Sequence, residues 1–281
     1  MPAAAKGERL STTAVLIGAG RMGSAMARGW VRSLKTAGIG KLFVVEPAPG
    51  EEIAAWGKSG KIALNKPAVV VDLAVLAVKP QGFAKAVRDI APWVGPETLV
   101  VSIMAGITIE SISRALHVSK VARAMPNTPG AVGKGVTGYA VSRACGVVER
   151  GVVERVLAPL GGVVGPLEER LMDVVTAVSG SGPAYVFLLA EALEAAGKHA
   201  GLDDATAAAL ARATVVGAAA LMEQGGDPGE LRKAVTSPGG TTAAALDVLL
   251  ARGALPDLMR KAVEAAVQRG QELSGEADKK R

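Results

Sequence analysis

Short apolar runs alternate with amphipathic stretches through the first half of the chain. Thr13–Ile17 is an apolar run that stops at Gly18, as a buried parallel strand does. After it, apolar side chains recur every fourth position from Met22 to Leu34, which predicts a helix with one buried face. Further strands are predicted at Lys41–Val45, Val71–Val78, Thr98–Ile103 and Lys120–Ala124, with a helix at Gln81–Val94. This alternation predicts an α/β fold with a doubly wound, mostly parallel (Rossmann) sheet.

The second half of the chain has a different pattern, with Ala- and Leu-rich segments and no convincing strand. The predicted helices are Pro183–His199, Asp203–Gln224, Pro228–Val235, Thr241–Arg252 and Leu255–Leu273. Asp203 or Asp204 is suited to cap the second of these helices, and Gly225 to end it. We therefore expect a dinucleotide-binding domain at residues 1–168 and an all-α domain at 169–281. Several of these helices are apolar on more than one side, which predicts a subunit interface.

Composition narrows the range of partners. The formal charge is +6, but the basic residues are scattered and aromatic side chains make up 3% of the chain. This favours anionic small molecules over a nucleic-acid partner. The single cysteine, Cys145, and two distant histidines offer no metal site. No apolar run resembles a signal peptide, and none reaches the length of a membrane span without Gly, Pro or charge, so we expect a cytoplasmic protein with no membrane partner.

A glycine-rich turn joins the first predicted strand to the first predicted helix. Gly18, Gly20 and Gly23 form a GxGxxG pattern in the position that binds a dinucleotide. The first glycine allows the tight turn, the second lets the pyrophosphate approach the backbone, and the third lets the helix pack on the strand. The helix N-terminus then adds its free N–H groups and dipole. The alternative is a plain strand-to-helix turn with no ligand.

Glu46, at the end of the second predicted strand, bears on the choice of cofactor. A carboxylate there accepts hydrogen bonds from the adenosine ribose hydroxyls and repels a 2′-phosphate, which favours NADH. Lys58 and Lys66 are near enough in sequence to reach a phosphate, so the choice between NADPH and NADH stays open. A solvated loop carboxylate is the alternative interpretation.

Further clusters extend over nearly the whole chain. They are Ile17–Gly23, Ala77–Gln81, Ala124–Pro129, Ala177–Tyr185 and Thr236–Thr242. In this order they resemble the pyrroline-5-carboxylate reductase family, and the last two are highly specific for it. The resemblance implies hydride transfer from NAD(P)H to the C=N bond of 1-pyrroline-5-carboxylate, giving L-proline. It also implies a homodimer of interlocked helical domains, often assembled further into a decamer, with the substrate between the nicotinamide and a neighbouring subunit's helices.

The resemblance and the residue patterns together give two sets of site residues. The cofactor set is Ile17, Gly18, Ala19, Gly20, Arg21, Met22, Gly23, Glu46, Asn65, Ala77, Val78, Lys79, Pro80, Ile103, Met104 and Ala105. The substrate set is Glu169, Ser179, Gly180, Ser181, Gly239, Gly240, Thr241 and Thr242. Asn65 is implied to contact the adenosine ribose, and Glu169 the substrate side; a turn residue and a surface carboxylate are the respective alternatives.

The glycines and threonines before the helix at Thr241 predict an anion site for the substrate carboxylate. Ordinary helix capping is the alternative. Thr242 is the candidate catalytic residue, as a hydrogen-bond partner for the ring nitrogen. It is no general acid at neutral pH, so we expect the substrate to bind already protonated. Small residues around Gly180 suit either the ligand or a tight helix contact.

Three other functions compete with this interpretation. A β-hydroxyacid dehydrogenase shares the glycine turn and a helical second domain, and Lys198 would be its acid/base; a cation at a helix C-terminus explains Lys198 as well. A cofactor-binding regulatory protein would not need the second anion site. A nucleic-acid binder would show salt-dependent retention on DNA.

Overall fold

The computed structural model describes residues 12–32 and 34–279. Two compact units are present. The first runs up to Gly180 and includes the residues from Val267 onward, and the second is Ser181–Ala266. The division at Gly180 falls after the predicted boundary at residue 168, and the end of the last helix belongs to the first unit.

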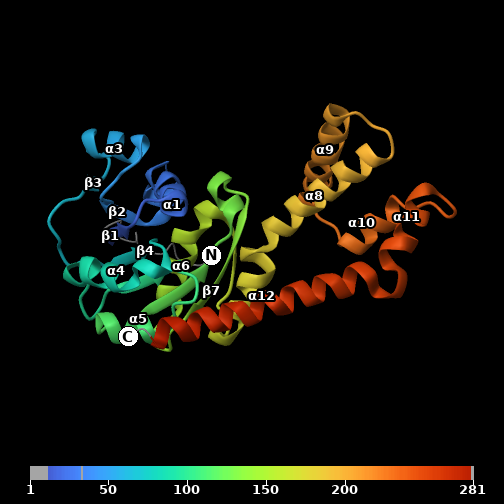
Figure 1. The fold of residues 1–281 in the computed structure, drawn as a ribbon. Coiled ribbons are helices and arrows are strands. Elements are labelled where there is room, and N and C mark those ends of the chain that lie inside the picture. Colours follow the sequence, from blue (N-terminus) through green and yellow to red (C-terminus); the bar gives the residue numbers. More distant parts are fainter. Residues whose placement is uncertain (1–11, 33, 280–281) are drawn as a thin grey trace, which may run out of the picture. The chain divides into compact units, whose positions relative to one another are not determined.

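The first unit contains an eight-stranded sheet in the order β3-β2-β1-β4-β5-β6-β7-β8 (Figure 1). The strands are β1 (Thr12–Ile17), β2 (Ile39–Val45), β3 (Ala63–Leu64), β4 (Leu73–Leu76), β5 (Leu99–Ser102), β6 (Val121–Met125), β7 (Gly135–Val141) and β8 (Gly161–Val164). Every pair is parallel except β6 and β7. The chain leaves β1 for β2 on one side and returns to β4 on the other, so the doubly wound fold is confirmed.

Helices cover the two faces of this sheet. The α-helices are α1 (Arg21–Arg32), α2 (Leu34–Ala37), α3 (Glu51–Lys58), α4 (Phe83–Ile90), α5 (Ile109–Leu116), α6 (Val147–Leu157) and α7 (Met172–Val175). Shorter helical turns are η1 (Pro80–Gly82), η2 (Ala91–Trp93), η3 (Thr128–Val132), η4 (Ala158–Leu160), η5 (Glu169–Leu171) and the π-helical η6 (Thr176–Gly180).

Alternate residues of the strands feed two separate cores. Leu16 faces one core with Met26 and Trp30 of α1, and the indole N–H of Trp30 donates to the carbonyl of Val156 in α6 at 2.9 Å. Its neighbour Ile17 faces the other core, which α4 and α5 cover. Burial on both faces explains why these strands are continuous apolar runs rather than alternating ones.

The second unit is entirely helical. It holds α8 (Gly182–His199), α9 (Asp204–Glu223), α10 (Pro228–Ala234), α11 (Thr241–Leu250), η7 (Ala251–Gly253) and the first part of α12 (Ala254–Lys279). Asp203 accepts from the backbone N–H of Thr206 at 3.0 Å, which confirms it as the N-cap of α9. The helix packs back on α8, where a Cβ added to Gly197 would lie 3.5 Å from the Cβ of Ala207.

This helical unit buries almost none of its apolar side chains. Of its residues, all of which the structure describes, only Ala207 and Ala211 are buried. Phe187 is 62% exposed and Leu188 is 64% exposed. Two helical stretches, Glu169–His199 and Asp204–Glu223, are long and apolar enough by length and composition to cross a membrane. A helical unit with so little core needs a cover from outside itself.

Candidate active site

The glycine-rich turn has the geometry that each of its glycines was predicted to provide. Gly18 has φ of +92°, and a Cβ there would lie 2.8 Å from Val78 Cγ1. A Cβ on Gly23 would lie 2.2 Å from the carbonyl oxygen of Gly18. In contrast, a Cβ on Gly20 would meet no atom within 4 Å. The turn therefore closes tightly at its two ends and leaves open space at its middle glycine, where a pyrophosphate would approach.

Helix α1 begins directly at this turn. Its first residue is Arg21, and the Ser24 hydroxyl donates to the carbonyl of Ala19 at 2.5 Å. This hydrogen bond ties the glycine-rich loop to the first residues of α1. The free amides and the positive dipole end that a helix start provides are therefore located at this turn. Ser24 follows the glycine pattern directly but was not among the predicted site residues.

Glu46 and Asn65 lie together beside this turn. One carboxylate oxygen of Glu46 accepts the N–H of Ala19 at 2.7 Å, and the other accepts the N–H of Ala48 at 3.0 Å. The Asn65 amide accepts the N–H of Glu46 and donates to its carbonyl, both at 2.9 Å. These hydrogen bonds connect the glycine turn, the end of β2 and Asn65. The spacing of these residues in the sequence could not predict the connection.

Strands β4 and β5 end at the same end of the sheet as β1, where the strands have their carboxyl ends. Ile17 is in register with Leu76, and Leu76 with Ser102. The hydrogen bonds between these strands continue for one more residue. The N–H of Ala77 donates to the carbonyl of Ile17 at 2.9 Å, and the N–H of Ile103 donates to the carbonyl of Leu76 at 3.0 Å. The predicted segments after β4 and β5 (Ala77, Val78, Lys79, Pro80 and Ile103, Met104, Ala105) therefore lie beside the glycine turn. Within them, the Lys79 side chain is exposed and that of Met104 is buried.

Ser179 and Gly180 contact the end of the neighbouring strand β6. The Asn127 side chain donates to the Ser179 hydroxyl at 3.3 Å and accepts the N–H of Val136 at 2.9 Å. A Cβ on Gly180 would lie 2.7 Å from Met125 Cε, the end of a flexible side chain that would have to move aside. Gly180 thus packs against Met125, its predicted place in the substrate site stays a prediction, and Asn127 orients Ser179 at the same end of the sheet.

Glu169 has contacts within the first unit. It accepts the N–H of Ile109 at 2.7 Å, at the start of α5, and pairs with the nearly buried Arg123 at 3.6 Å. Arg123 also pairs with Asp173 of α7 at 3.0 Å. These contacts give Glu169 a structural role, and its predicted place on the substrate side remains a prediction.

The second predicted anion site lies wholly within the helical unit. Gly239 has φ of +69°, and a Cβ on Gly240 would lie 2.5 Å from the Ser237 hydroxyl oxygen. Gly240 is the N-cap of α11 and provides no side-chain cap, so Thr241 and Thr242 open the helix with uncapped amides. The backbone conformation thus favours glycine at 239, the Ser237 side chain would have to move for a larger residue at 240, and the helix start is available to an anion.

Lys198, the alternative acid/base, is held in ion pairs. Its ammonium lies 3.0 Å from Glu194 and 3.1 Å from Asp204, next to the last residue of α8. Hydrogen bonds that the ammonium donates to these two carboxylates raise the pKa of Lys198 above its ordinary value. A raised pKa is the opposite of what a general base at neutral pH requires.

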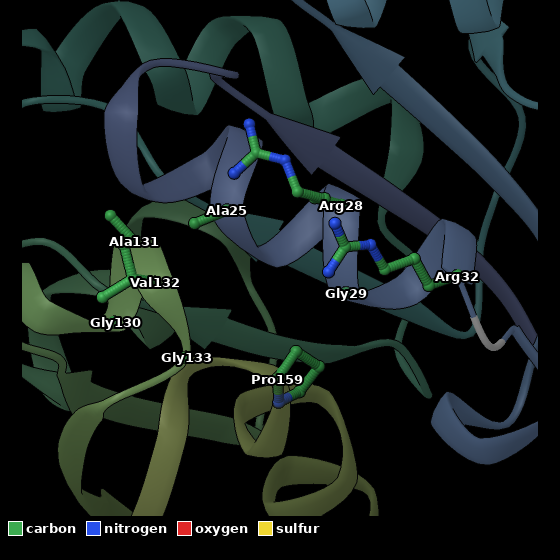
Figure 2. A pocket seen from close by; sticks show the side chains of 9 residues that line it. All are labelled: Ala25, Arg28, Gly29, Arg32, Gly130, Ala131, Val132, Gly133 and Pro159. Carbon is green, nitrogen blue, oxygen red and sulfur yellow. The ribbon is translucent and has the colours of Figure 1, made fainter.

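Two other polar features are separate from the predicted site. A hollow of about 320 Å³ lies between α1 and η3 (Figure 2), lined by Ala25, Arg28, Gly29, Arg32, Gly130, Ala131, Val132, Gly133 and Pro159. It contains none of the predicted residues, and the Arg28 guanidinium pairs with Glu52 at 2.6 Å. No group of three potential metal-ligating side chains occurs in residues 12–32 and 34–279.

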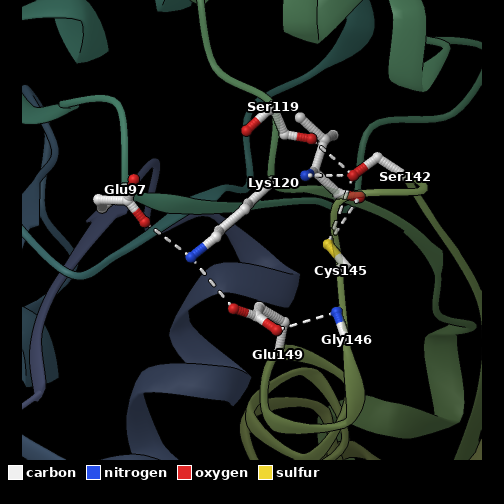
Figure 3. Close-up of polar contacts among 8 residues, drawn as sticks. Glu97, Ser119, Lys120, Ser142, Cys145, Gly146 and Glu149 are labelled. Atoms are coloured by element: carbon white, nitrogen blue, oxygen red, sulfur yellow. Dashed lines mark hydrogen bonds and ion pairs between the residues drawn. The ribbon is translucent and has the colours of Figure 1, made fainter.

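Lys120 bridges two carboxylates at the opposite end of the strands (Figure 3). It lies 2.9 Å from Glu97 and 3.1 Å from Glu149. Lys120 precedes β6 and Glu97 precedes β5, whereas the glycine turn follows β1. The buried thiol of Cys145 lies close by, 3.4 Å from the Ser142 hydroxyl. This network therefore stabilises the sheet at the edge away from the cofactor turn.

Comparisons with known proteins cover both units. Residues 169–273 match the family model described as pyrroline-5-carboxylate reductase dimerisation. A pyrroline-5-carboxylate reductase of Pseudomonas aeruginosa is 37% identical over 92% of this chain and 95% of its own length. The chain belongs to the pyrroline-5-carboxylate reductase family. It is accordingly an NAD(P)H-dependent oxidoreductase, and membership of this family argues against the β-hydroxyacid dehydrogenase alternative.

Other members agree with this placement. The reductase of Synechocystis is 40% identical over 73% of this chain and 76% of its own. A solved pyrroline-5-carboxylate reductase from Coxiella burnetii has a TM-score of 0.83 at 31% identity, over 93% of this chain and 98% of the other. One from Plasmodium falciparum, with NADP bound, has a TM-score of 0.73 at 27% identity, over 94% and 98%. Residues 13–106 match a family model described as NADP oxidoreductase, coenzyme F420-dependent.

Proposed function

We propose that this chain reduces the C=N bond of 1-pyrroline-5-carboxylate with NAD(P)H and forms L-proline. The observation that carries the proposal is the glycine turn, which leaves open space at Gly20 beside the edge where β1, β4 and β5 end. Its relatives carry the same activity in their names. The substrate is a small anion, in agreement with a chain of positive net charge.

The cofactor would be held by backbone more than by side chains. The pyrophosphate fits the amides at Gly20 and the start of α1, and the adenosine ribose fits beside Glu46 and Asn65. The segments after β4 and β5 would line the nicotinamide end, where the bound cofactor supplies the hydride. The protein's contribution is to position that group, which explains why a site with no nearby cysteine or histidine suffices.

The substrate carboxylate would bind the N-terminus of α11 at Gly239, Gly240, Thr241 and Thr242. Anchored there, the ring is oriented so that its imine carbon receives the hydride and its nitrogen ends as the amine. Thr242 would donate or accept a hydrogen bond at that nitrogen. Ser179, Gly180, Ser181 and Glu169 are the other residues proposed for the substrate, which in a dimer would lie between the nicotinamide and a neighbouring subunit's helices. The imine enters protonated, so no side chain is needed as a general acid.

The assembly would be a homodimer through the helical unit. Its exposed apolar side chains need a cover, and the matching family model is one of dimerisation. A second copy accounts for the two apolar helical stretches without a membrane. We further propose a cytoplasmic enzyme with no nucleic-acid partner, in which dimers assemble into a decamer.

Steady-state reduction of 1-pyrroline-5-carboxylate, followed at 340 nm with NADH and NADPH in parallel, tests this function. Thr242→Ala should lower kcat/KM about 10- to 100-fold and leave cofactor affinity unchanged, because it removes one hydrogen bond at the substrate. Thr214→Ala, an exposed threonine of α9, is the matched control. Turnover by Thr242→Ala at the wild-type rate removes the substrate role of this residue, and no turnover with either cofactor removes the function.

A further inference from the structure

The carboxylate of Glu46 cannot easily turn away from the cofactor turn. One of its oxygens is bonded to the N–H of Ala19 and the other to the N–H of Ala48. Ala19 lies between Gly18, which closes the turn, and Gly20, where the pyrophosphate would approach, and its side chain is buried. The carboxylate is therefore tied to the turn that would hold the dinucleotide.

The backbone of Glu46 is fixed as firmly as its side chain. Both ends of the Asn65 amide bond it, at 2.9 Å each. Asn65 is itself held, because its N–H donates to the carbonyl of Val44 at 2.8 Å and its φ is +48°. Rotating the side chain would break the two hydrogen bonds at the carboxylate oxygens. Moving the backbone would break the two hydrogen bonds with Asn65.

Acidic residues follow Glu46 along the chain, and Arg21 and Lys66 are the nearest basic residues in sequence to its two partners Ala19 and Asn65. No ion pair joins Glu46 to a lysine or arginine anywhere in residues 12–32 and 34–279. Residues 47–50 hold no basic side chain, and Glu51 and Glu52 follow them. The guanidinium of Arg28, on the facing helix α1, is paired with Glu52. A phosphate group beside Glu46 would thus meet a carboxylate to which no basic side chain is bound.

The remaining lone pairs of this carboxylate suit hydroxyl groups. A carboxylate offers about four acceptor sites and no donor. Two are taken by backbone N–H groups, which leaves the others for the ribose 2′- and 3′-hydroxyls. A 2′-phosphate at neutral pH brings only acceptor oxygens and about −1.5 to −2 charge. It would lose the hydrogen bond and add repulsion.

We propose that Glu46 is the specificity-determining residue for the cofactor, and that it makes this reductase prefer NADH over NADPH. The inference rests on the proposed function, since it concerns the cofactor of the same reaction. It separates this chain from the relative whose structure holds NADP. Asn65 is the positioning residue, because it holds the backbone of Glu46 in place.

Binding of the adenosine half of the cofactor tests the proposal without turnover. Isothermal titration with ADP-ribose and 2′-phospho-ADP-ribose should show that the wild type binds the first about 30-fold more tightly. In Glu46→Gln the ratio should fall below about threefold, because the amide removes the charge and adds a donor. The ratio of kcat/KM for NADH and NADPH should fall in parallel.

Glu51→Gln is the matched control, since it removes one neighbouring carboxylate from the first turn of α3 and should leave the ratio unchanged. A wild-type ratio near one, or one that favours the phosphate, overturns the proposal, and so does a ratio that survives in Glu46→Gln. The wild-type ratio decides even where the variant does not fold. Failure to reduce 1-pyrroline-5-carboxylate with either cofactor counts against the proposed function alone, because the binding ratio does not depend on it.

Discussion

At the scale of single residues, the glycine turn makes the sharpest prediction. An alanine at Gly23 would place its Cβ 2.2 Å from the carbonyl oxygen of Gly18, so α1 must move away from the turn. We expect Gly23→Ala to lower the free energy of unfolding by about 1–3 kcal/mol, as overpacking does, and to weaken cofactor binding as well. Urea unfolding and isothermal titration with NADH measure the two effects.

Gly20→Ala separates binding from folding at the same turn. A Cβ at Gly20 meets no atom within 4 Å, so the free energy of unfolding should change by less than about 0.5 kcal/mol. The same Cβ would occupy the space of the pyrophosphate, so the dissociation constant for NADH should rise at least about tenfold. If Gly20→Ala binds NADH like the wild type, the dinucleotide does not approach the backbone at this glycine.

Glu149 predicts a pH dependence that has no connection with catalysis. A backbone N–H at the start of α6 and the Lys120 ammonium lower the pKa of this carboxyl below its ordinary value of 4.5. A lowered pKa in the folded state means that its stabilisation is complete above pH 4.5 and is lost as the pH falls through the folded value. Glu149→Gln should therefore be less stable than the wild type at pH 7, and the difference in unfolding free energy should shrink below pH 4.5.

The measurement is urea unfolding of both proteins between pH 3 and pH 7. Glu97→Gln is the control, since the Glu97 side chain is 87% exposed and that of Glu149 only 20%. An exposed ion pair contributes about 0–1 kcal/mol, so this control should follow the wild type closely. A gap between Glu149→Gln and the wild type that stays constant across this range would contradict the assignment.

Much of the cofactor side could be predicted from residues, because each glycine has a distinct steric reason for its place. The contact between Glu46 and Ala19 could not, since it joins two loops that are distant in sequence. The bonds from Asn65 to the backbone of Glu46 are of the same kind. Sequence spacing places a carboxylate at a strand end but does not say what holds it.

At the scale of elements, the helices of the second half were predicted more completely than the strands and helices of the first, where α3, α5 and α6 were not assigned. Each predicted helix of the second half is present, because Pro, Asp and Gly mark their ends. The strands β3, β7 and β8 were missed: β3 has only two residues, and both β7 and β8 contain glycines that weaken an apolar pattern. The predicted helix at Gln81–Val94 is shorter, since Gly82 and Pro92 fall in separate 3-10 turns at its ends.

Arg123 and Asp173 connect β6 to α7, just before the segment that holds Ser179. The Arg123 side chain is 6% exposed and that of Asp173 is 19% exposed, so the pair is largely shielded from water. Removing one partner of a buried pair leaves a charge without full compensation, which costs about 3–5 kcal/mol. We expect Asp173→Ala to lose stability near the lower end of that range in urea unfolding, because Glu169 remains 3.6 Å from Arg123.

Glu264→Ala provides the comparison for this ion pair. Glu264 accepts from Arg260 at 2.9 Å, but both side chains are more than half exposed. Such a pair contributes about 0–1 kcal/mol, and the variant should unfold close to the wild type. Equal losses of unfolding free energy in the two variants would mean that burial does not distinguish these ion pairs. The packing of α7 on β6 would then not depend on the pair between Arg123 and Asp173.

At the scale of the whole molecule, the helical unit is incomplete on its own. Its apolar helices were recognised in the sequence, but a pattern that is apolar on several sides does not say which side meets a partner. In the structure, large side chains such as Phe187, Leu210, Val216 and Val248 are all more than half exposed. An exposed apolar area of this kind marks an interface, and the matching family model names dimerisation.

Phe187→Asp tests whether this surface joins two subunits. A charge at an apolar interface cannot be covered without a large desolvation cost, so the dimer dissociation constant should rise at least about 100-fold. Val148→Asp on α6 is the matched control, because Val148 is 75% exposed but belongs to the first unit. Sedimentation velocity at micromolar protein should show Phe187→Asp as a monomer and Val148→Asp with the sedimentation coefficient of the wild type. If both variants sediment like the wild type, the subunits meet elsewhere and the exposed face of α8 needs another explanation.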